Sequence, residues 1–359
     1  METSVAQRDP AALLAAANRL REAEGLRARD LAGRLGVSEG ELLAAEVGAG
    51  GGGRVVRLVD DATAILREVP RLGEVMALTR NEAAVHEKTG TYGKVELESG
   101  HGGVFEQPID LRLFMSHWRS GFAVEQPGPE GAMRRSLQFF DAHGTAVHKV
   151  HLGPQSRVEV FEELVARFAE PAQPPGLAVT PRPARKADRP DEAVDREALV
   201  RRWQAMTDVH QFFGLLRELE VGREQAFRLA GSRLAFPVAR GSFALAGEMA
   251  AAGGVSIMIF VANMGCTQIH TGPVGTIKAM GPWWNILDPG FNLHLRQDLV
   301  ARAWVVRKPM AGHMVTSLEI FDEQARLIAI MYGERPRGEP EQPAWRALLD
   351  RLPRLDAPA

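Results

Sequence analysis

The sequence of 359 residues contains one cysteine, Cys266, and this scarcity limits the chemistry open to the protein. A single cysteine forms no internal disulfide and no cysteine-cage metal site, and it fits a reducing compartment. No run approaches the roughly 18 apolar residues of a membrane-spanning helix. The first ten residues, METSVAQRDP, mix acids, a base and a proline, unlike a secretory signal. We therefore expect a cytoplasmic protein without membrane insertion.

Neither sign of charge dominates, because 43 lysines and arginines stand against 45 aspartates and glutamates. A nucleic-acid-binding protein usually presents a basic face, so we expect no nucleic acid partner. Residues 29–46 read as helix, turn, helix, but packed helix pairs are far commoner than DNA-binding ones. The signatures HExxH, GxSxG, GxGxxG and the P-loop are missing. CxxCH is missing too, which excludes that route of covalent haem attachment.

Segments of the first half return in the second half in the same order. SLQFFD at 136–141 matches SLEIFD at 317–322, at a separation of 181 residues. IDLRL at 109–113 matches FNLHL at 291–295 at a separation of 182. Ordered matches at a near-constant separation are hard to obtain by coincidence, so we interpret them as an internal duplication of two similar α+β halves.

A linker separates the two halves. Residues 171–194 hold six prolines among mixed charges, a composition typical of extended or disordered chain. We expect an N-terminal half at 1–170, a linker at 171–195 and a C-terminal half at 196–359. Hydrophobic periodicity predicts the elements within the halves. The expected helices cover 11–46, 158–168, 196–233 and 344–352, and the expected strands 72–82, 132–152 (a hairpin turning at 140–144), 255–263, 291–295, 301–308, 315–322 and 326–333.

The duplication singles out His210. A structural residue should recur in both halves, whereas a functional residue need not, and His210 aligns with Leu14. His210 is expected in the first turn or two of a helix that Thr207 or Asp208 could cap. A neutral imidazole beside aromatic rings suits the axial position of an iron porphyrin. By itself, a lone histidine at such a place is more often an ordinary surface or core-edge residue.

Several longer motifs resemble those of the HemS-type family, the cytoplasmic hemin-transport or hemin-degrading proteins of bacterial haem uptake. They are RNEAAVHEKTGTY (80–92), IDLRLFMSHW (109–118), SLQFFDAHG (136–144), WQAMTDVHQFFGLL (203–216), DPGFNLHL (288–295), VVRKP (305–309) and YGERPRGEPEQPAW (332–345). The resemblance runs from about residue 15 to 352 and includes the duplication. It implies a large antiparallel β-sheet with flanking helices in each half, and a haem cleft to which both halves contribute.

The resemblance also implies roles for individual residues. His210 matches the axial ligand of the haem iron, and Arg112 matches a distal arginine on the opposite haem face, catalytic if the protein is an enzyme. A guanidinium has no lone pair for iron, so Arg112 would act on a bound water or oxygen. Lys308, Tyr332 and Arg335 match groups near the haem propionates, where cations and a hydroxyl donor are expected. His86 matches a first-half histidine implicated in haem binding or chemistry, and Arg223 lies in a motif that borders the haem pocket.

The resemblance implies non-covalently bound haem b (iron protoporphyrin IX) and leaves three functions open. The first is a carrier that takes imported haem and delivers it for iron release. The second is a haem-degrading enzyme, similar to a haem oxygenase, with an external electron donor. The third is a haem-responsive regulator. Partners besides haem would be the ATPase side of a haem importer, a haem oxygenase or a reductase. Some haem-shuttling members carry extra histidines after the ligand, where this chain has Gln211, Phe212 and Phe213.

Overall fold

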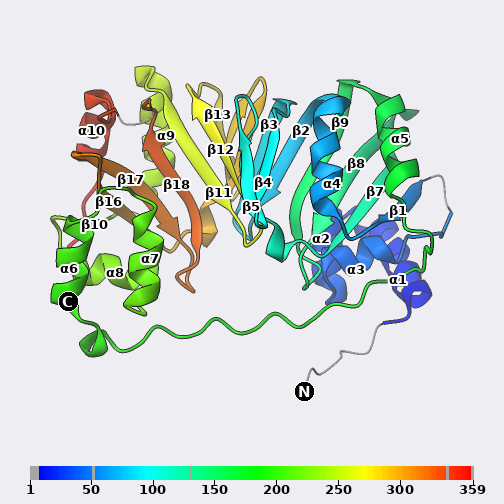
Figure 1. Ribbon diagram of the computed structural model, residues 1–359, viewed down its shortest axis with the longest axis horizontal. Coiled ribbons are helices and arrows are strands. Elements are labelled where there is room, and N and C mark those ends of the chain that lie inside the picture. Colours follow the sequence, from blue (N-terminus) through cyan, green and yellow to red (C-terminus); the bar gives the residue numbers. More distant parts are fainter. Residues whose placement is uncertain (1–7, 51–52, 129–130, 337–338, 357–359) are drawn as a thin grey trace. The chain divides into compact units, whose positions relative to one another are not determined.

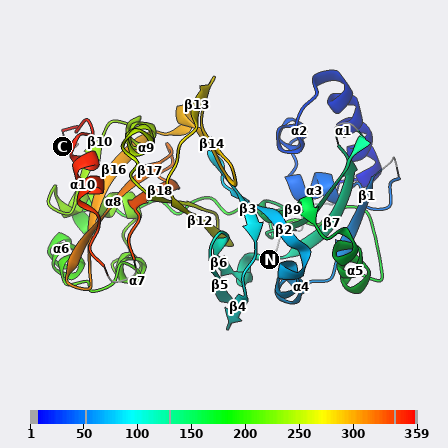
Figure 2. The same cartoon turned by 90° about the horizontal axis from the view of Figure 1, so that it is seen from above.

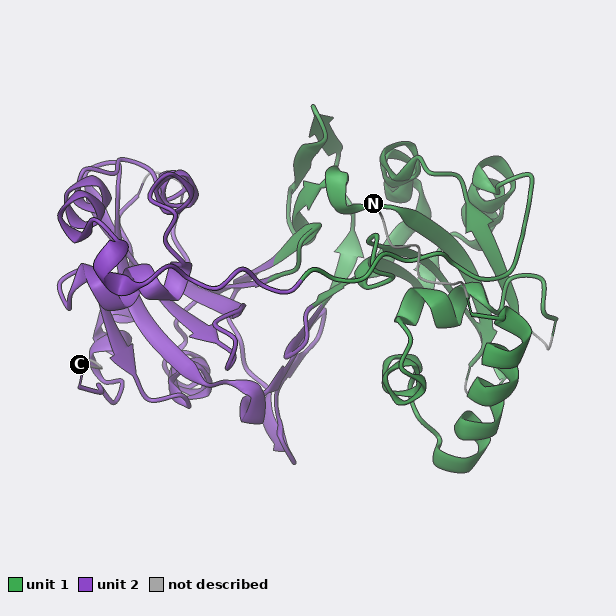
Figure 3. Ribbon diagram, turned by 90° about the horizontal axis from the view of Figure 1, so that it is seen from below, with its two compact units in different colours: residues 1–80, 87–183, 262–268 green, residues 81–86, 184–261, 269–359 purple. Residues whose placement is uncertain are grey.

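A computed structural model describes residues 8–50, 53–128, 131–336 and 339–356. The chain forms two compact units, which Figure 3 distinguishes by colour. Unit 1 comprises residues 1–80, 87–183 and 262–268, and unit 2 comprises 81–86, 184–261 and 269–359. Within the described ranges no helix is both long and apolar enough to cross a membrane.

Unit 1 is built of short helices and antiparallel strands (Figure 1). Its helices are α1 (Pro10–Glu24), α2 (Ala28–Leu35), α3 (Glu39–Ala44), α4 (Ala62–Glu68) and α5 (Val158–Phe168), with 3-10 turns η1 (Val69–Leu72) and η2 (Met115–His117). One set of strands follows the order β1 (Arg54–Leu58), β7 (Ser120–Pro127), β8 (Met133–Phe140), β9 (Ala146–Ser156), β2 (Gly73–Arg80) and β3 (Ala84–Thr91). A second set has the order β6 (Asp110–Phe114), β5 (His101–Phe105) and β4 (Val95–Glu98).

The larger strand set of unit 1 has apolar side chains on both faces, because helices cover both. Leu43 and Ala44 of α3 pack with Phe122 and Phe140 on one face. On the other face, α4 and α5 pack against alternate residues of the same strands, such as Leu137. The helix α3 thus turns its apolar residues to the sheet, which stabilises the packed helix pair expected from the sequence.

Unit 2 repeats this arrangement. Its helices are α6 (Arg196–Gln204), α7 (Gln211–Glu218), α8 (Arg223–Ala230), α9 (Ser242–Gly253) and α10 (Pro343–Asp350), with η4 (Asp191–Ala193) and η5 (Gln297–Leu299). One strand set has the order β10 (Ala235–Val238), β16 (Arg302–Met310), β17 (His313–Phe321), β18 (Leu327–Gly333), β11 (Ile257–Ala262) and β12 (Cys266–Gly272). Residues 266–268 of β12 belong to unit 1, and residues 84–86 of β3 belong to unit 2. The other has the order β15 (Phe291–Arg296), β14 (Trp283–Asp288) and β13 (Ile277–Met280).

Alternation along the strands of unit 2 separates two cores. Trp304 and Val306 pack with α6, α7 and α8 on one face, whereas Ala303 and Val305 pack with α9 and α10 on the other. Figure 2 shows α7 and α9 on opposite sides of these strands. The predicted fold class, two similar halves with large antiparallel sheets and flanking helices, is confirmed. The predicted helix at 158–168 and the hairpin of β8 and β9 are present. The helix α9 was not predicted, because its many alanines and glycines give no clear polar stripe.

Candidate functional site

His210 lies at the start of α7 in unit 2. The helix begins at Gln211, so His210 is its N-cap residue and stands just before the first turn in which it was expected. Its side chain is 81% exposed. The next two aromatic residues differ, since Phe212 is buried in the core and Phe213 is 66% exposed. An accessible imidazole therefore stands beside an accessible aromatic ring.

Asp208 determines which nitrogen of His210 can bind a metal. Its Oδ1 lies 2.6 Å from His210 Nδ1 and also accepts a hydrogen bond of 2.8 Å from the His210 backbone N–H. A carboxylate only accepts hydrogen bonds, so Nδ1 is the protonated nitrogen of the neutral ring and Nε2 carries the lone pair. Histidines that bind metals commonly donate their second N–H to a carboxylate in this way. The sequence suggested Asp208 only as a helix cap.

The loop before His210 is tied to the hairpin of β16 and β17. The backbone N–H of Ala311 donates to the carbonyl of Thr207 over 2.8 Å. On the same hairpin, Met310 Sδ lies 3.2 Å from Arg335 Nη2. Arg335, predicted to contact a propionate, is thus brought to the end of the sheet where His210 lies.

Lys308 and Arg223 meet at one buried carboxylate. Glu319 Oε1 accepts from Lys308 Nζ at 2.6 Å and from Arg223 Nη2 at 3.0 Å, and Oε2 accepts from Arg223 Nε at 2.7 Å. The Lys308 and Glu319 side chains are 2% and 0% exposed, whereas Arg223 retains 14%. The sequence gave no signal for Glu319, because a lone glutamate in a strand is an ordinary residue.

Tyr332 lies on β18 beside this cluster. It is the cross-strand partner of Ser317 on β17, and Ser317 Oγ donates to Glu319 at 3.0 Å. The Tyr332 ring stands edge-on to Phe260, with ring centroids 5.5 Å apart. Four of the predicted groups, Arg223, Lys308, Tyr332 and Arg335, therefore belong to one region of unit 2, which also contains the start of α7.

The remaining predicted residues lie elsewhere in their own units. Arg112 is on β6 of unit 1, where it pairs with Asp110 and lies 4.8 Å over the ring of Phe105. Its side chain is 38% exposed. His86 lies on β3 but belongs to unit 2, where it is fully buried and its ring centroid lies 5.0 Å from that of Phe291.

Unit 1 contains a buried polar network that the sequence did not indicate. His148 receives contacts at both ring nitrogens, from Tyr92 Oη at 2.5 Å and from Thr79 Oγ1 at 2.8 Å. Cys266 Sγ lies 3.3 Å from the Thr79 hydroxyl. Burial lowers the pKa of His148 to about 3, with a contribution from His151, and raises the pKa of Cys266 to about 12. Cys266 is thus a neutral core thiol.

Similarity to known proteins extends over both halves of the chain. A family model described as the haemin-degrading HemS.ChuX domain matches the chain twice, at residues 36–168 and 220–352. The hemin transport protein HmuS of Yersinia pestis is 40% identical over 343 residues, which cover 94% of this chain and 96% of HmuS.

Two solved structures are similar along nearly the whole chain. Holo-PhuS, a heme-binding protein from Pseudomonas aeruginosa, is 43% identical with a TM-score of 0.93, covering 97% of this chain and 100% of PhuS. ChuS, a heme degrading enzyme from Escherichia coli O157:H7, is 37% identical with a TM-score of 0.88, covering 96% of this chain and 99% of ChuS.

Proposed function

The chain belongs to the HemS family, and from this premise we propose that it is a cytoplasmic carrier that binds imported haem through His210 and delivers it for iron release. The cargo in this proposal is haem b, held without a covalent bond. The protein partners would be the ATPase side of a haem importer as donor and a haem oxygenase or a reductase on the receiving side.

The orientation of the His210 ring supports this proposal most directly. Asp208 holds the proton on Nδ1, which leaves the Nε2 lone pair for an axial bond to iron. The imidazole is accessible, so a planar ligand can reach it without unfolding α7. The exposed ring of Phe213 offers an apolar surface next to it. The residues present therefore fit a haem with one histidine ligand.

The charges in this region of unit 2 suit a ligand with carboxylates. Arg223 and Lys308 share the single negative charge of Glu319, so the cluster carries one positive charge in excess. Arg335 lies at the adjacent end of the sheet. Within the proposal, Arg223, Arg335 and Tyr332 are closer to solvent than Lys308, so they are the stronger candidates for direct propionate contacts. His86 and Arg112 keep their predicted roles in haem binding.

A haem-degrading activity is the second candidate, because ChuS is a heme degrading enzyme and is 37% identical to this chain. In that case Arg112 would be the catalytic residue, donating hydrogen bonds to oxygen as negative charge develops there. Electrons would come from an external reductase, since the sequence shows no nucleotide-binding signature.

The ligand assignment is tested with His210→Ala. Removal of the imidazole should weaken haem binding and shift the Soret band, while the apo-protein keeps its far-ultraviolet circular dichroism. The matched control is His143→Ala, which removes a partly exposed histidine of unit 1 that contacts Thr180. Unchanged haem affinity and spectrum in His210→Ala would contradict the assignment.

Carrier and enzyme are separated by incubating the haem complex with an electron donor in the presence of catalase. Catalase removes free peroxide, which attacks many haem proteins nonspecifically. Transfer of intact haem to an apo-haem oxygenase supports the carrier, whereas an opened tetrapyrrole with released iron supports the enzyme.

A further inference from the structure

We propose that Glu319 is a positioning residue for His210. Glu319 fixes two cations against the aromatic rings that follow His210 in α7, and so holds the start of that helix in place. This inference rests on the proposed role of His210 as the haem ligand.

Glu319 uses both carboxylate oxygens. Arg223 binds it through Nε and Nη2, a bidentate pair, while Lys308 and Ser317 donate to Oε1. Burial by itself raises the pKa of the Glu319 carboxyl, but the charges and hydrogen bonds of Arg223 and Lys308 outweigh it and lower that pKa to about 2. The carboxylate is therefore ionised at neutral pH, and the cluster forms one connected unit.

The two cations in turn hold the aromatic rings of α7. The Arg223 guanidinium lies 5.4 Å from the ring centroids of both Phe212 and Phe213. Lys308 Nζ lies 5.0 Å from the centroid of the Phe212 ring. Attraction between a cation and the face of a ring favours this arrangement. Phe212 and Phe213 follow His210 by two and three residues, so their rings determine where the first turn of α7 lies.

Loss of the negative charge on Glu319 would break this chain of contacts. Arg223 and Lys308 would then face each other as buried cations without a counter-charge, which is strongly unfavourable. Arg223 is the more exposed cation, with 14% of its side chain accessible, so it has the shorter path to water. If Arg223 moves outward, it no longer contacts the rings of Phe212 and Phe213, and the first turn of α7 is no longer held in place.

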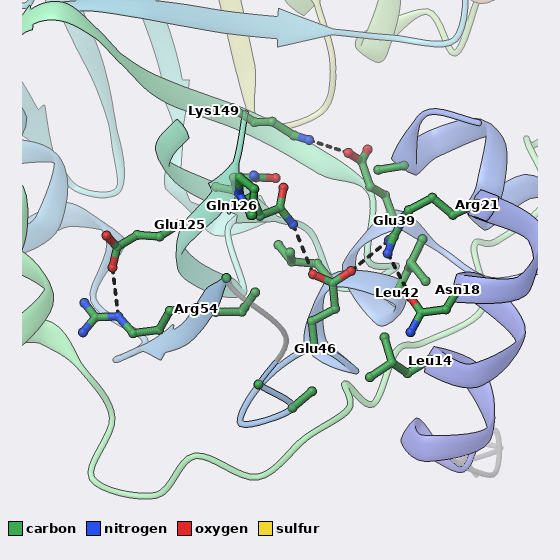
Figure 4. Close-up of a pocket in the computed structure, with 18 residues that line it drawn as sticks. Leu14, Asn18, Arg21, Glu39, Leu42, Glu46, Arg54, Glu125, Gln126 and Lys149 are labelled. Carbon is green, nitrogen blue, oxygen red and sulfur yellow. Dashed lines mark hydrogen bonds and ion pairs between the residues drawn. The ribbon is translucent and has the colours of Figure 1, made fainter. Parts of the chain in front are cut away.

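The duplication provides an internal comparison with the ion pair of Glu39 and Lys149 in unit 1, which Figure 4 shows. The two segments matched by the family model begin at residues 36 and 220, and in each a helix begins three residues later, at Glu39 in α3 and at Arg223 in α8. The matching motifs SLQFFD and SLEIFD place Gln138 at the position of Glu319. In unit 1 the helix residue Glu39 pairs with Lys149, the cross-strand partner of Gln138.

Both units thus join the first residue of this helix to the sheet by an ion pair, but with opposite signs. The Glu39 and Lys149 side chains are each 11% exposed, comparable to the 14% of Arg223. A pocket of ≈ 440 Å³ lies beside the pair in unit 1. The fold therefore does not require the arrangement found in unit 2. The bidentate arginine and the second cation are features of the half that carries His210.

The experiment compares Glu319→Gln with the matched control Glu39→Gln, which breaks the equivalent ion pair of unit 1. The first measurement is the ring carbon–proton correlation spectrum of the apo-protein, with the His210 signal assigned from its disappearance in His210→Ala. The second is the rate of haem transfer to apomyoglobin. We expect Glu319→Gln to shift or broaden the His210 signal and to speed haem loss by about tenfold, the low end of what removal of a group bonded directly to a metal ligand causes, because Glu319 acts through Arg223, Lys308 and the two rings. Glu39→Gln should change neither.

The two measurements separate this inference from the proposed function. If the His210 signal of Glu319→Gln matches that of Glu39→Gln, or haem loss stays within about twofold of the original protein, the positioning role is wrong. If His210→Ala binds haem with unchanged affinity, His210 is not the haem ligand. The apo-protein spectra then still test whether Glu319 determines the position of His210 at the start of α7. Should Glu319→Gln not fold, Arg223→Lys replaces it, because it keeps the charge but loses the bidentate contact; an unmoved His210 signal there also overturns the proposal.

Discussion

Replacement of Asp208 should weaken haem binding by an amount that follows from its contact with His210. The charge-assisted bond from Nδ1 to Oδ1 measures 2.6 Å, and bonds of this kind contribute roughly 1.5–3 kcal/mol. The two side chains are 47% and 81% exposed, so water screens the charge and the lower end applies. About 1.4 kcal/mol corresponds to a tenfold change in affinity. We therefore expect Asp208→Ala to raise the Kd for haem about tenfold.

A second variant divides this effect into charge and geometry. Asp208→Asn keeps an acceptor oxygen for Nδ1 but removes the charge, and a neutral hydrogen bond is about half as strong as a charged one. The expected loss is therefore about threefold. Haem titration monitored at the Soret band measures both variants. The ratio of the two Kd values separates the effect of the Asp208 charge from the effect of the hydrogen bond that orients the imidazole.

Asp208 also accepts from the backbone N–H of His210, so a local change at the helix start must be measured separately. Thr207→Ala is the matched control, because Thr207 contacts Gln211 in the same loop but not the imidazole. Thermal unfolding of the apo-proteins reports any loss of stability. If Asp208→Ala binds haem within twofold of Thr207→Ala, the argument that the carboxylate orients the ligand is refuted.

Three further outcomes are expected. Arg112→Ala should bind haem moderately less tightly and keep the spectrum of histidine-bound haem, because a guanidinium has no lone pair for iron. If Arg112→Ala loses haem affinity as completely as His210→Ala, Arg112 is a main binding residue and the distal role is wrong. His148 has a pKa of about 3 in the folded protein against 6.5 for the ordinary side chain, so the unfolded chain binds the extra proton and stability falls as the pH drops from about 6.5 toward 3. Urea unfolding between pH 7 and pH 4.5 should show a shallower pH dependence in His148→Gln, and an unchanged slope would contradict the burial argument. Cys266, whose pKa is about 12, should react with iodoacetamide at pH 8 only slowly in the native protein and rapidly in urea; fast native labelling would exclude a closed core there.

The sequence by itself determined the features that depend on neighbouring residues. The apolar spacing of residues 158–168 predicted α5, and the turn at 140–144 between alternating runs predicted the hairpin of β8 and β9. Comparison of distant segments revealed the duplication, and the alignment expected from the sequence paired His210 with Leu14. The helices correct that pairing: Arg27 precedes α2 as His210 precedes α7, so His210 still has no histidine counterpart in the first half. Such signals are readable without coordinates because helix and strand periods and turn preferences are local properties of the chain.

Only the tertiary structure decided how the charged residues are used. Arg223 and Glu319 are 96 residues apart, and no periodicity links them. Lys308 was predicted to lie near a propionate. In the structure only 2% of its side chain is exposed, and it forms an ion pair with Glu319 beside the ring of Phe212. The long side chains of lysine, arginine and glutamate are compatible with either a surface or a buried ion pair. Which one forms depends on the partner that folding brings within about 3 Å, because a buried charge is tolerated only when such a partner is present.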